Sequence, residues 1–235
     1  RSISKLLNTY IDSLPKQISK STNRIHTNFL QTVAATGRLS SVNPNLQNIP
    51  IRTESGKEIR KAFIPRNKDF FLMAADYSQI ELRVIAALSK EDNMISSFEK
   101  NEDIHLSTAA TVFNIPLEKV TKQQRSHAKI VNFGIIYGVS AFGLSNQTDL
   151  NIKESKNLID TYYEKYPKLK QFIEKQISFA RDKGYVETIL GRRRVLRDIN
   201  SSNSIIKSAA ERNAVNAPIQ GLSLIHISEP TRRYA

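Results

Sequence analysis

Two cations and two aromatic rings recur at a spacing of four in RSHAKIVNFGIIYG: Arg125, Lys129, Phe133 and Tyr137. At about 100° per residue in a helix, they form one stripe about 120° wide. Two cations one turn apart suit a polyphosphate, and the two rings beyond them suit a base or sugar on which they can stack. A glycine follows each ring, which removes a side chain where a flat ligand would approach. The spacing therefore predicts a surface that could bind a nucleotide.

The helix that would carry this stripe has a defined start. Thr121 followed by Gln124 forms a capping box, which predicts that the helix begins just after Thr121. Ala128, Val131 and Ile135 lie on the opposite side, where they can anchor the helix to a core and leave the stripe facing a cleft. A surface Arg and Lys followed by two core aromatics would produce the same spacing. The helix by itself leaves both interpretations open.

A second candidate for chemistry is DYSQIELR, which begins at Asp76. The apolar run FFLMAAD, residues 70–76, predicts a buried strand that ends at Asp76, and Glu81 follows one and a half turns into the next helix. Because an unpaired buried carboxylate is costly, a divalent cation such as Mg²⁺ would account for an acid at this place. An Asp that caps the helix accounts for it too, and is the simpler interpretation of this stretch alone.

The composition of the chain limits the kinds of partner that it can bind. A chain of 235 residues with 40% hydrophobic content can bury the core of one large domain or two small ones. Its formal net charge of +13 favours a polyanion, most simply nucleic acid, although many ribosomal and membrane-surface proteins are also basic. The absence of Cys excludes disulfides, thiolate metal sites and a Cys nucleophile. No apolar run reaches the roughly 20 residues that span a bilayer, so no membrane partner is expected.

The elements around these residues predict a mixed α+β chain with little strand and much helix. Residues 31–65 are rich in turn-forming residues and are predicted to be an irregular loop. VETILGRRRVL predicts a β-ribbon around a turn that contains Gly. The apolar spacing predicts helices over residues 79–88, 106–113, 122–137, 153–180 and 204–215. Residues 85–215 should therefore form a mostly helical block.

Four stretches together resemble the A family of DNA polymerases, the bacterial DNA polymerase I type: TGRLSSVNPNLQNIPIR, DYSQIELR, R-x-x-x-K-x-x-x-F-G-x-x-Y-G and ERNAVNAPIQG. They follow the family's order and spacing from about Lys5 to Gly221. The resemblance implies an α+β right-hand polymerase fragment, with part of an antiparallel palm sheet and a mostly helical fingers subdomain. It implies a palm segment at residues 1–84, with the end of the thumb connection, fingers at 85–215, and a return toward the palm at 216–221.

The resemblance also implies a site for an incoming deoxynucleoside triphosphate. Its nucleotide-binding residues would be Gln79, Glu81, His105, Arg125, Lys129, Phe133 and Tyr137. Arg125 and Lys129 match fingers residues that hold the triphosphate, with His105 and Gln79 assisting. Glu81 matches the residue that blocks a ribose 2′-hydroxyl and so selects deoxynucleotides.

Catalysis and the two rings complete that implied site. Asp76 matches the first metal-binding carboxylate of the palm, where two Mg²⁺ ions drive phosphoryl transfer, and Lys129 would share in catalysis. Phe133 matches the ring that packs on the incoming sugar and base. Tyr137 matches the ring that stacks near the templating base and moves as the fingers close.

Other matched residues would hold primer–template DNA through a palm loop and a helix along the minor groove. Amide and guanidinium donors suit this contact, because minor-groove acceptors occupy similar places in every correct base pair. Without the resemblance, a polar loop and a solvated helix face would explain them. The implied DNA-binding residues are Arg38, Asn43, Asn45, Gln47, Asn48, Arg212, Asn216 and Gln220.

The resemblance implies a monomer in the cytoplasm, bacterial or phage-encoded. Two alternatives stay open: a single-subunit RNA polymerase and a non-catalytic basic module that binds nucleic acid. Glu81 argues against the first, since a ribonucleotide enzyme needs room there, and the joint presence of Asp76, Lys129 and Tyr137 argues against the second.

The end of the chain departs from the family. Residues 222–235, LSLIHISEPTRRYA, replace the expected continuation toward a second catalytic acid in a His-Asp-Glu segment, which this sequence lacks. Leu222–Arg232 instead resembles a translated transposon-end sequencing adapter, so we interpret residues 222–235 as non-native, against the alternative of a divergent tail. The chain as written is expected to bind primer–template DNA weakly and not to polymerise.

Overall fold

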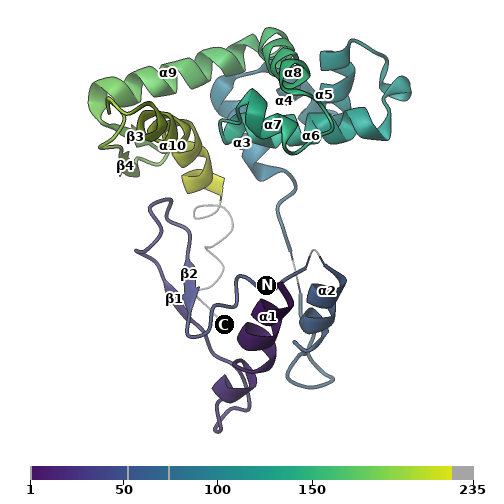
Figure 1. The fold of residues 1–235 in the computed structure, drawn as a ribbon, viewed down its shortest axis with the longest axis vertical. Coiled ribbons are helices and arrows are strands. Elements are labelled where there is room, and N and C mark those ends of the chain that lie inside the picture. The colour runs from purple at the N-terminus through teal and green to yellow at the C-terminus, as the bar shows by residue number, and fades with distance from the viewer. Residues whose placement is uncertain (1, 52, 74, 224–235) are drawn as a thin grey trace. The chain divides into compact units, whose positions relative to one another are not determined.

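A computed structural model describes residues 2–51, 53–73 and 75–223, and the chain divides into two compact units, Arg1–Asp76 and Tyr77–Ala235 (Figure 1). The described residues are mostly helical, with two small antiparallel sheets of two strands each. This confirms the predicted mixture of much helix and little strand. None of the helices that the structure describes is long and apolar enough to cross a membrane.

The first unit combines short helices with one small sheet. Its elements are α1 (Ser2–Leu6), a π-helical turn (Leu7–Ile11), a 3-10 turn (Pro15–Gln17), β1 (Asn28–Leu30), β2 (Ser40–Val42) and α2 (Glu54–Lys61). β1 and β2 pair antiparallel, with Phe29 opposite Ser41. The Thr27 hydroxyl donates to the carbonyl of Pro44 at 2.7 Å, which ties the loop after β2 to the start of β1.

One prediction for the first unit is wrong in part. Residues 31–65 are not irregular throughout, because they contain β2 and α2. The signal for α2 is local: the Thr53 side chain accepts from the backbone N–H of Gly56 at 3.1 Å and caps the helix. The ion pairs Glu54–Lys57 and Glu58–Lys61, each three residues apart, add support along its surface.

The buried strand predicted over residues 70–76 is also wrong. Phe71 and Met73 are each 89% exposed, and neither sheet formed by the described residues includes this segment. An apolar run becomes a buried strand only where neighbouring strands and a covering layer pack against it. Asp76 is therefore exposed, and the cost of burying a carboxylate does not apply to it here.

The second unit is built mainly from helices. In chain order they are α3 (Ile80–Ser89), α4 (Asp92–Glu99), α5 (Ile104–Phe113), a 3-10 turn (Leu117–Lys119), α6 (Lys122–Ile136), α7 (Ala141–Ser145), α8 (Ile152–Lys165), α9 (Pro167–Lys183) and α10 (Ser204–Ser223). Figure 1 shows α3–α8 gathered together, with α9 leading from them to α10. Side chains of these helices share one buried cluster that includes Leu82, Ile104, Val131, Leu158 and Ile219.

The predicted helices are confirmed in kind, with two differences in extent. Residues 153–180 form two helices, because Tyr166 leaves the helical conformation and Pro167 starts α9. A proline lacks the N–H that an interior position needs but suits the first helical turn, so it favours a break at this place. The helix predicted over 204–215 continues to Ser223 and contains Pro218.

The predicted β-ribbon is confirmed as a hairpin of β3 (Tyr185–Glu187) and β4 (Arg193–Val195). Val186 points into a second buried cluster with Ala180 of α9 and with Ala210 and Ala214 of α10. The small alanine side chains let α10 pack closely against α9 and the hairpin. This packing fixes α10 beside the helices that carry the candidate site.

Candidate nucleotide-binding site

Helix α6 begins and packs as its sequence predicts. The Thr121 hydroxyl accepts from the backbone N–H of Gln124 at 3.2 Å, and the Gln124 side chain accepts from the N–H of Thr121 at 3.0 Å. Ala128, Val131 and Ile135 are buried and anchor the helix to the core. The opposite face therefore stays open to a ligand.

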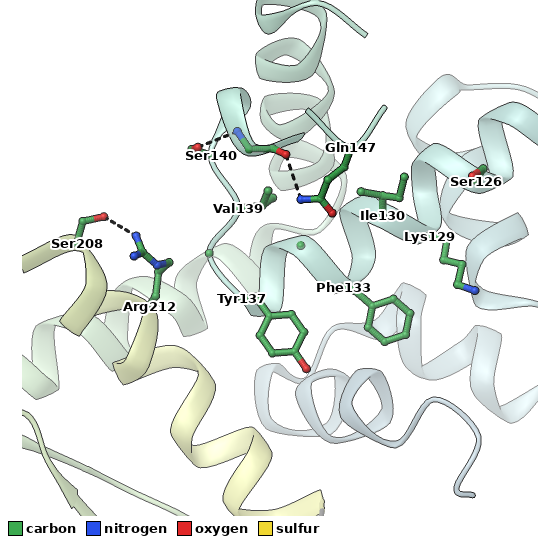
Figure 2. A pocket seen from close by; sticks show the side chains of 13 residues that line it. Ser126, Lys129, Ile130, Phe133, Tyr137, Val139, Ser140, Gln147, Ser208 and Arg212 are labelled. Carbon is green, nitrogen blue, oxygen red and sulfur yellow. Dashed lines mark hydrogen bonds between the residues drawn. The ribbon is translucent and has the colours of Figure 1, made fainter. Parts of the chain in front are cut away.

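The stripe on that open face borders a cavity of about 580 Å³. Figure 2 shows Lys129, Phe133 and Tyr137 in order along α6, with Arg212 of α10 beyond Tyr137. Lys129 and Tyr137 are exposed and Phe133 is half-buried. Arg125 does not line the cavity. Three of the four stripe residues thus line one cavity, together with Arg212 from a distant part of the chain.

The two glycines of the stripe make room for the protein's own chain, and the expectation that they also make room for a ligand stays a prediction. A Cβ on Gly134 would lie 2.7 Å from Cγ1 of Val139. Gly138 has φ +66°, and a Cβ there would lie 2.5 Å from Cγ of Arg212. Both glycines line the cavity. Their small size lets the chain turn back at the end of α6 and lets Arg212 approach.

One hydrogen bond joins two predicted nucleotide residues that lie far apart in sequence. The Tyr137 hydroxyl donates to Oε2 of Glu81 at 2.6 Å. Glu81 lies in the first turn of α3, where a carboxylate is favoured by the positive end of the helix dipole. Gln79 immediately precedes α3 with a left-handed backbone, φ +54°. The fold therefore brings the start of α3 to the ring end of the stripe.

Arg125 is held by a residue that the sequence analysis missed. Its Nε and Nη2 both donate to Oδ2 of Asp103, at 2.9 and 2.6 Å. The other oxygen of Asp103 caps α5 by accepting from the N–H groups of His105 and Leu106, at 2.9 and 3.2 Å. Partial burial opposes ionisation, but Arg125 and these backbone donors outweigh it and lower the pKa of Asp103. An Asp before an apolar helix start was the available signal.

His105 is buried beside the stripe, with only 3% of its surface exposed. Its ring centroid lies 5.7 Å from that of Phe133. Burial lowers the pKa of His105, and the charges of Arg125 and Lys129 lower it further, although Asp103 acts in the opposite direction. The imidazole is therefore neutral at physiological pH and lies within electrostatic reach of both cations.

The predicted DNA-binding residues fall into two groups, one in each unit. In the first unit, Asn43, Asn45, Gln47 and Asn48 are exposed on the loop after β2, as is Arg38 before it. The Gln47 side chain accepts from the N–H of Ser41 at 3.0 Å, and that of Asn45 from the N–H of Gln47 at 3.0 Å. Two of these amides thus also shape the loop that presents them.

The second group lies on α10. Arg212 is exposed and donates from Nη1 to the Ser208 hydroxyl at 3.0 Å. Asn216 is half-buried, and its buried Oδ1 has no hydrogen-bond partner in the described part of the chain. Gln220 is buried. Among the three, only Arg212 reaches the cavity beside α6.

The family model for DNA polymerase family A matches residues 1–224 of this chain. The chain belongs to DNA polymerase family A. This family A chain is 52% identical over 221 residues to the DNA polymerase I of Pseudomonas aeruginosa, a match that covers 94% of this chain and 24% of that protein. It is 51% identical over 221 residues to the DNA polymerase I of Borreliella burgdorferi, with the same coverage of 94% and 24%. The chain thus spans about a quarter of the length of these curated relatives.

A solved structure supports the fold of the family A chain. It is described as the POL domain of Pol1 from M. smegmatis in complex with DNA primer-template and dNTP. The TM-score is 0.85 at 43% identity, over 94% of this chain and 39% of that one. The predicted fold class, an α+β fragment of a right-hand polymerase, is confirmed. The predicted non-native tail is outside the described residues from 224 onward, and the family match ends at residue 224.

The described residues of this family A chain supply one candidate metal ligand, Asp76. Mg²⁺ typically takes one or two carboxylates and completes its shell with water and substrate phosphates, so an exposed carboxylate suits it. Over residues 2–51, 53–73 and 75–223, no group of three His, Asp or Glu side chains is arranged to hold a metal ion. Asp76 thus fits a Mg²⁺ ion held largely by a substrate, and the two-ion site stays a prediction.

Proposed function

We propose that this chain is the nucleotide-binding part of a template-directed DNA polymerase, which adds deoxynucleotides to a primer 3′ end in DNA replication or repair. One observation carries the proposal: Lys129, Phe133 and Tyr137 line one cavity, and the Tyr137 hydroxyl donates to Glu81. The order of these side chains matches the order of phosphate, sugar and base in a nucleotide.

Each part of the cavity suits one part of a deoxynucleoside triphosphate. Lys129 offers an exposed cation, and an ammonium bound to phosphate oxygens makes charge-assisted hydrogen bonds. Phe133 offers a ring against which a sugar and base can pack. Glu81, hydrogen-bonded to the Tyr137 hydroxyl, is the carboxylate that we assign to oppose a ribose 2′-hydroxyl by bulk and charge. Arg125 would join the triphosphate site from its pair with Asp103.

Divalent metal ions are used by A-family DNA polymerases, and we propose Mg²⁺ as the ion and Asp76 as one ligand. Bound Mg²⁺ would stabilise the charge that develops on the transferred phosphoryl group. The proposed partners are primer–template DNA and deoxynucleoside triphosphates, as in the complex with the M. smegmatis protein. We further propose a palm segment in residues 1–84, fingers in 85–215, a return toward the palm in 216–221, and a monomeric cytoplasmic protein, bacterial or phage-encoded.

Lys129→Ala tests the proposal. Deoxynucleotide affinity is measured by calorimetry with the 235-residue chain, primer–template DNA and Mg²⁺, and DNA affinity by fluorescence anisotropy. Loss of a hydrogen-bonded charge should cost about 1.5–3 kcal/mol, which is about 10- to 150-fold in nucleotide affinity. DNA affinity should change little.

The matched control is Lys122→Ala, which removes an exposed Lys from the first turn of the same helix. This control should leave both affinities nearly unchanged. Equal effects of the two substitutions would contradict the assignment of Lys129. Strong DNA binding without any nucleotide binding would favour a non-catalytic nucleic-acid-binding module, and a preference for ribonucleotides would favour an RNA polymerase.

A further inference from the structure

A buried polar network lies behind the stripe, and Asn132 is at its centre. Asn132 lies on α6 between the cavity residues and is fully buried. Its Nδ2 donates to Nδ1 of His105 at 3.1 Å and to the Thr108 hydroxyl at 3.1 Å. Its Oδ1 accepts from the Tyr162 hydroxyl at 2.9 Å. One amide thereby joins α5, α6 and α8.

The Tyr162 hydroxyl sets the orientation of this amide. Tyr162 is itself buried, and burial raises its pKa well above the ordinary value, so the hydroxyl keeps its proton. A Tyr162 hydroxyl that donates to Oδ1 turns Nδ2 toward His105. The Thr108 hydroxyl can donate or accept, so it fits either orientation. The Tyr162 hydroxyl could also accept, but its only hydrogen-bond partner among the described residues is Asn132, so accepting from a turned amide would leave its own buried O–H without an acceptor. Tyr162 therefore favours the orientation that turns Nδ2 toward His105.

The orientation of Asn132 decides which nitrogen of His105 carries the proton. A nitrogen that accepts a hydrogen bond must have a free lone pair, so Nδ1 is unprotonated. In a neutral imidazole the proton then lies on Nε2. His105 makes no hydrogen bond from Nε2 to any residue that the structure describes, so this N–H is available to a ligand.

Charge and position indicate the class of ligand. The His105 ring packs against Phe133 and lies within electrostatic reach of Arg125 and Lys129, as the lowered pKa of His105 reflects. Two cations and a neutral N–H donor together suit phosphate oxygens, which accept hydrogen bonds and carry negative charge. An Nδ1–H tautomer would instead present a lone pair at Nε2 and repel them.

We propose that Asn132 is a positioning residue that holds His105 in the Nε2–H tautomer, so that this N–H donates to a phosphate oxygen of a nucleoside triphosphate bound at Lys129. The ligand rests on the proposed function, whereas the tautomer rests on the network alone. Packing of the three helices would also account for a buried Asn. The decisive readout is therefore the protonation of the imidazole and not stability.

The test uses ¹⁵N-labelled 235-residue chain and long-range ¹H–¹⁵N spectra, which distinguish the two tautomers of a histidine. The unaltered chain should show His105 protonated on Nε2 near pH 7.5. In Asn132→Asp the new carboxylate can only accept, so His105 should become protonated on Nδ1 and should titrate at higher pH. Asn114→Asp makes the same change at the exposed end of α5 and should leave His105 unchanged.

Tyr162→Phe keeps the test decisive if a buried carboxylate prevents folding. It removes only the hydroxyl that orients Asn132, so the amide can turn over and a measurable fraction of His105 should shift to the Nδ1–H form. An unaltered chain with His105 protonated on Nδ1 would overturn the proposal. An unchanged tautomer in folded Asn132→Asp or Tyr162→Phe would overturn it equally.

A titration with dATP and Mg²⁺ tests the proposed ligand independently of the proposed tautomer. The Nε2 signal of His105 should shift on binding, and Asn132→Asp should bind dATP about 10-fold or more weakly above the His105 titration. The dATP affinity of Asn132→Asp should recover as pH falls, because the imidazolium form of His105 donates from both nitrogens. The charged groups that act on His105 are Asp103, Arg125 and Lys129. Absence of dATP binding to the unaltered chain would overturn the proposed function and this ligand. Binding without a change at Nε2 would overturn only the role of His105.

Discussion

Gly138→Ala perturbs the place where the end of α6 meets Arg212. Gly138 has φ +66°, and a Cβ there would lie 2.5 Å from Cγ and 3.0 Å from Cδ of Arg212. Cγ is close to the backbone, so the whole Arg212 side chain must rotate to relieve the contact. Gly184→Ala is a matched control, because Gly184 has φ +75° and a Cβ there would meet nothing within 4 Å. The two variants share the backbone strain and differ in the clash.

The expected losses of folding stability follow from the backbone strain and the steric clash. An alanine in the left-handed region costs about 1–2 kcal/mol relative to glycine, which is the whole effect expected for Gly184→Ala. In Gly138→Ala, Arg212 must also leave its rotamer, at about 0.5–1.5 kcal/mol. It would lose its hydrogen bond to Ser208 as well, at about 0.5–1.5 kcal/mol. Gly138→Ala should therefore be less stable than Gly184→Ala by about 1–3 kcal/mol.

Stability is measured by urea unfolding, followed through the helical circular dichroism signal, most of which comes from the second unit. Primer–template affinity, measured by fluorescence anisotropy, gives an independent readout of the displaced Arg212. Gly138→Ala should weaken DNA binding, and Gly184→Ala should not. Equal stability of the two variants, or equal DNA affinity, would refute the inference that a side chain at position 138 displaces Arg212.

Three further predictions address the sugar, the DNA and the acid range. In an active polymerase containing this chain, Glu81→Ala should admit ribonucleotides in primer extension, because the carboxylate held by Tyr137 is gone; unchanged ribonucleotide exclusion would count against the gate. Primer–template affinity should fall linearly with salt on logarithmic axes, by about 0.9 per phosphate contacted, with little sequence preference; a salt-independent affinity would contradict the proposed contacts. Asp103→Asn should keep the cap on α5 but lose the pair with Arg125, at about 0.2–1 kcal/mol for such an exposed pair. Since the pKa of Asp103 is lowered, this loss should be full at neutral pH, should begin to shrink near pH 4, about the pKa of an unfolded Asp, and should vanish only below the lowered pKa of the folded state in urea titrations; a loss that persisted below that pKa would exclude the ion pair as its cause.

Local signals in the sequence predict the helices well because their causes are local. The capping box at Thr121 and Gln124 defines the start of α6 through hydrogen bonds between residues three apart. The spacing of Ala128, Val131 and Ile135 identifies the buried face, since a helix repeats every 3.6 residues wherever it packs. The hairpin around Gly191 follows in the same way from its turn. Such features need no knowledge of the rest of the chain.

The strand predicted over residues 70–76 fails for the opposite reason. Its apolar side chains meet the requirement for a buried strand, but a strand also needs partners that supply hydrogen bonds and cover its faces. Those partners are remote in sequence, and the described residues provide none for this segment. The break at Pro167 carried a local signal, whereas the continuation of α10 past Pro218 depends on packing.

That two cations and two rings share one face of α6 can be read from the sequence alone, because helical periodicity is a property of the backbone. Which distant groups contact that face depends on the tertiary packing. Asp103 at Arg125, Glu81 at Tyr137 and Asn132 at His105 are pairs separated by more than twenty residues, joined by hydrogen bonds that no spacing encodes. The type of a side chain limits the hydrogen bonds that it can make. The fold determines which partner it contacts, and that partner in turn affects its charge and its tautomer.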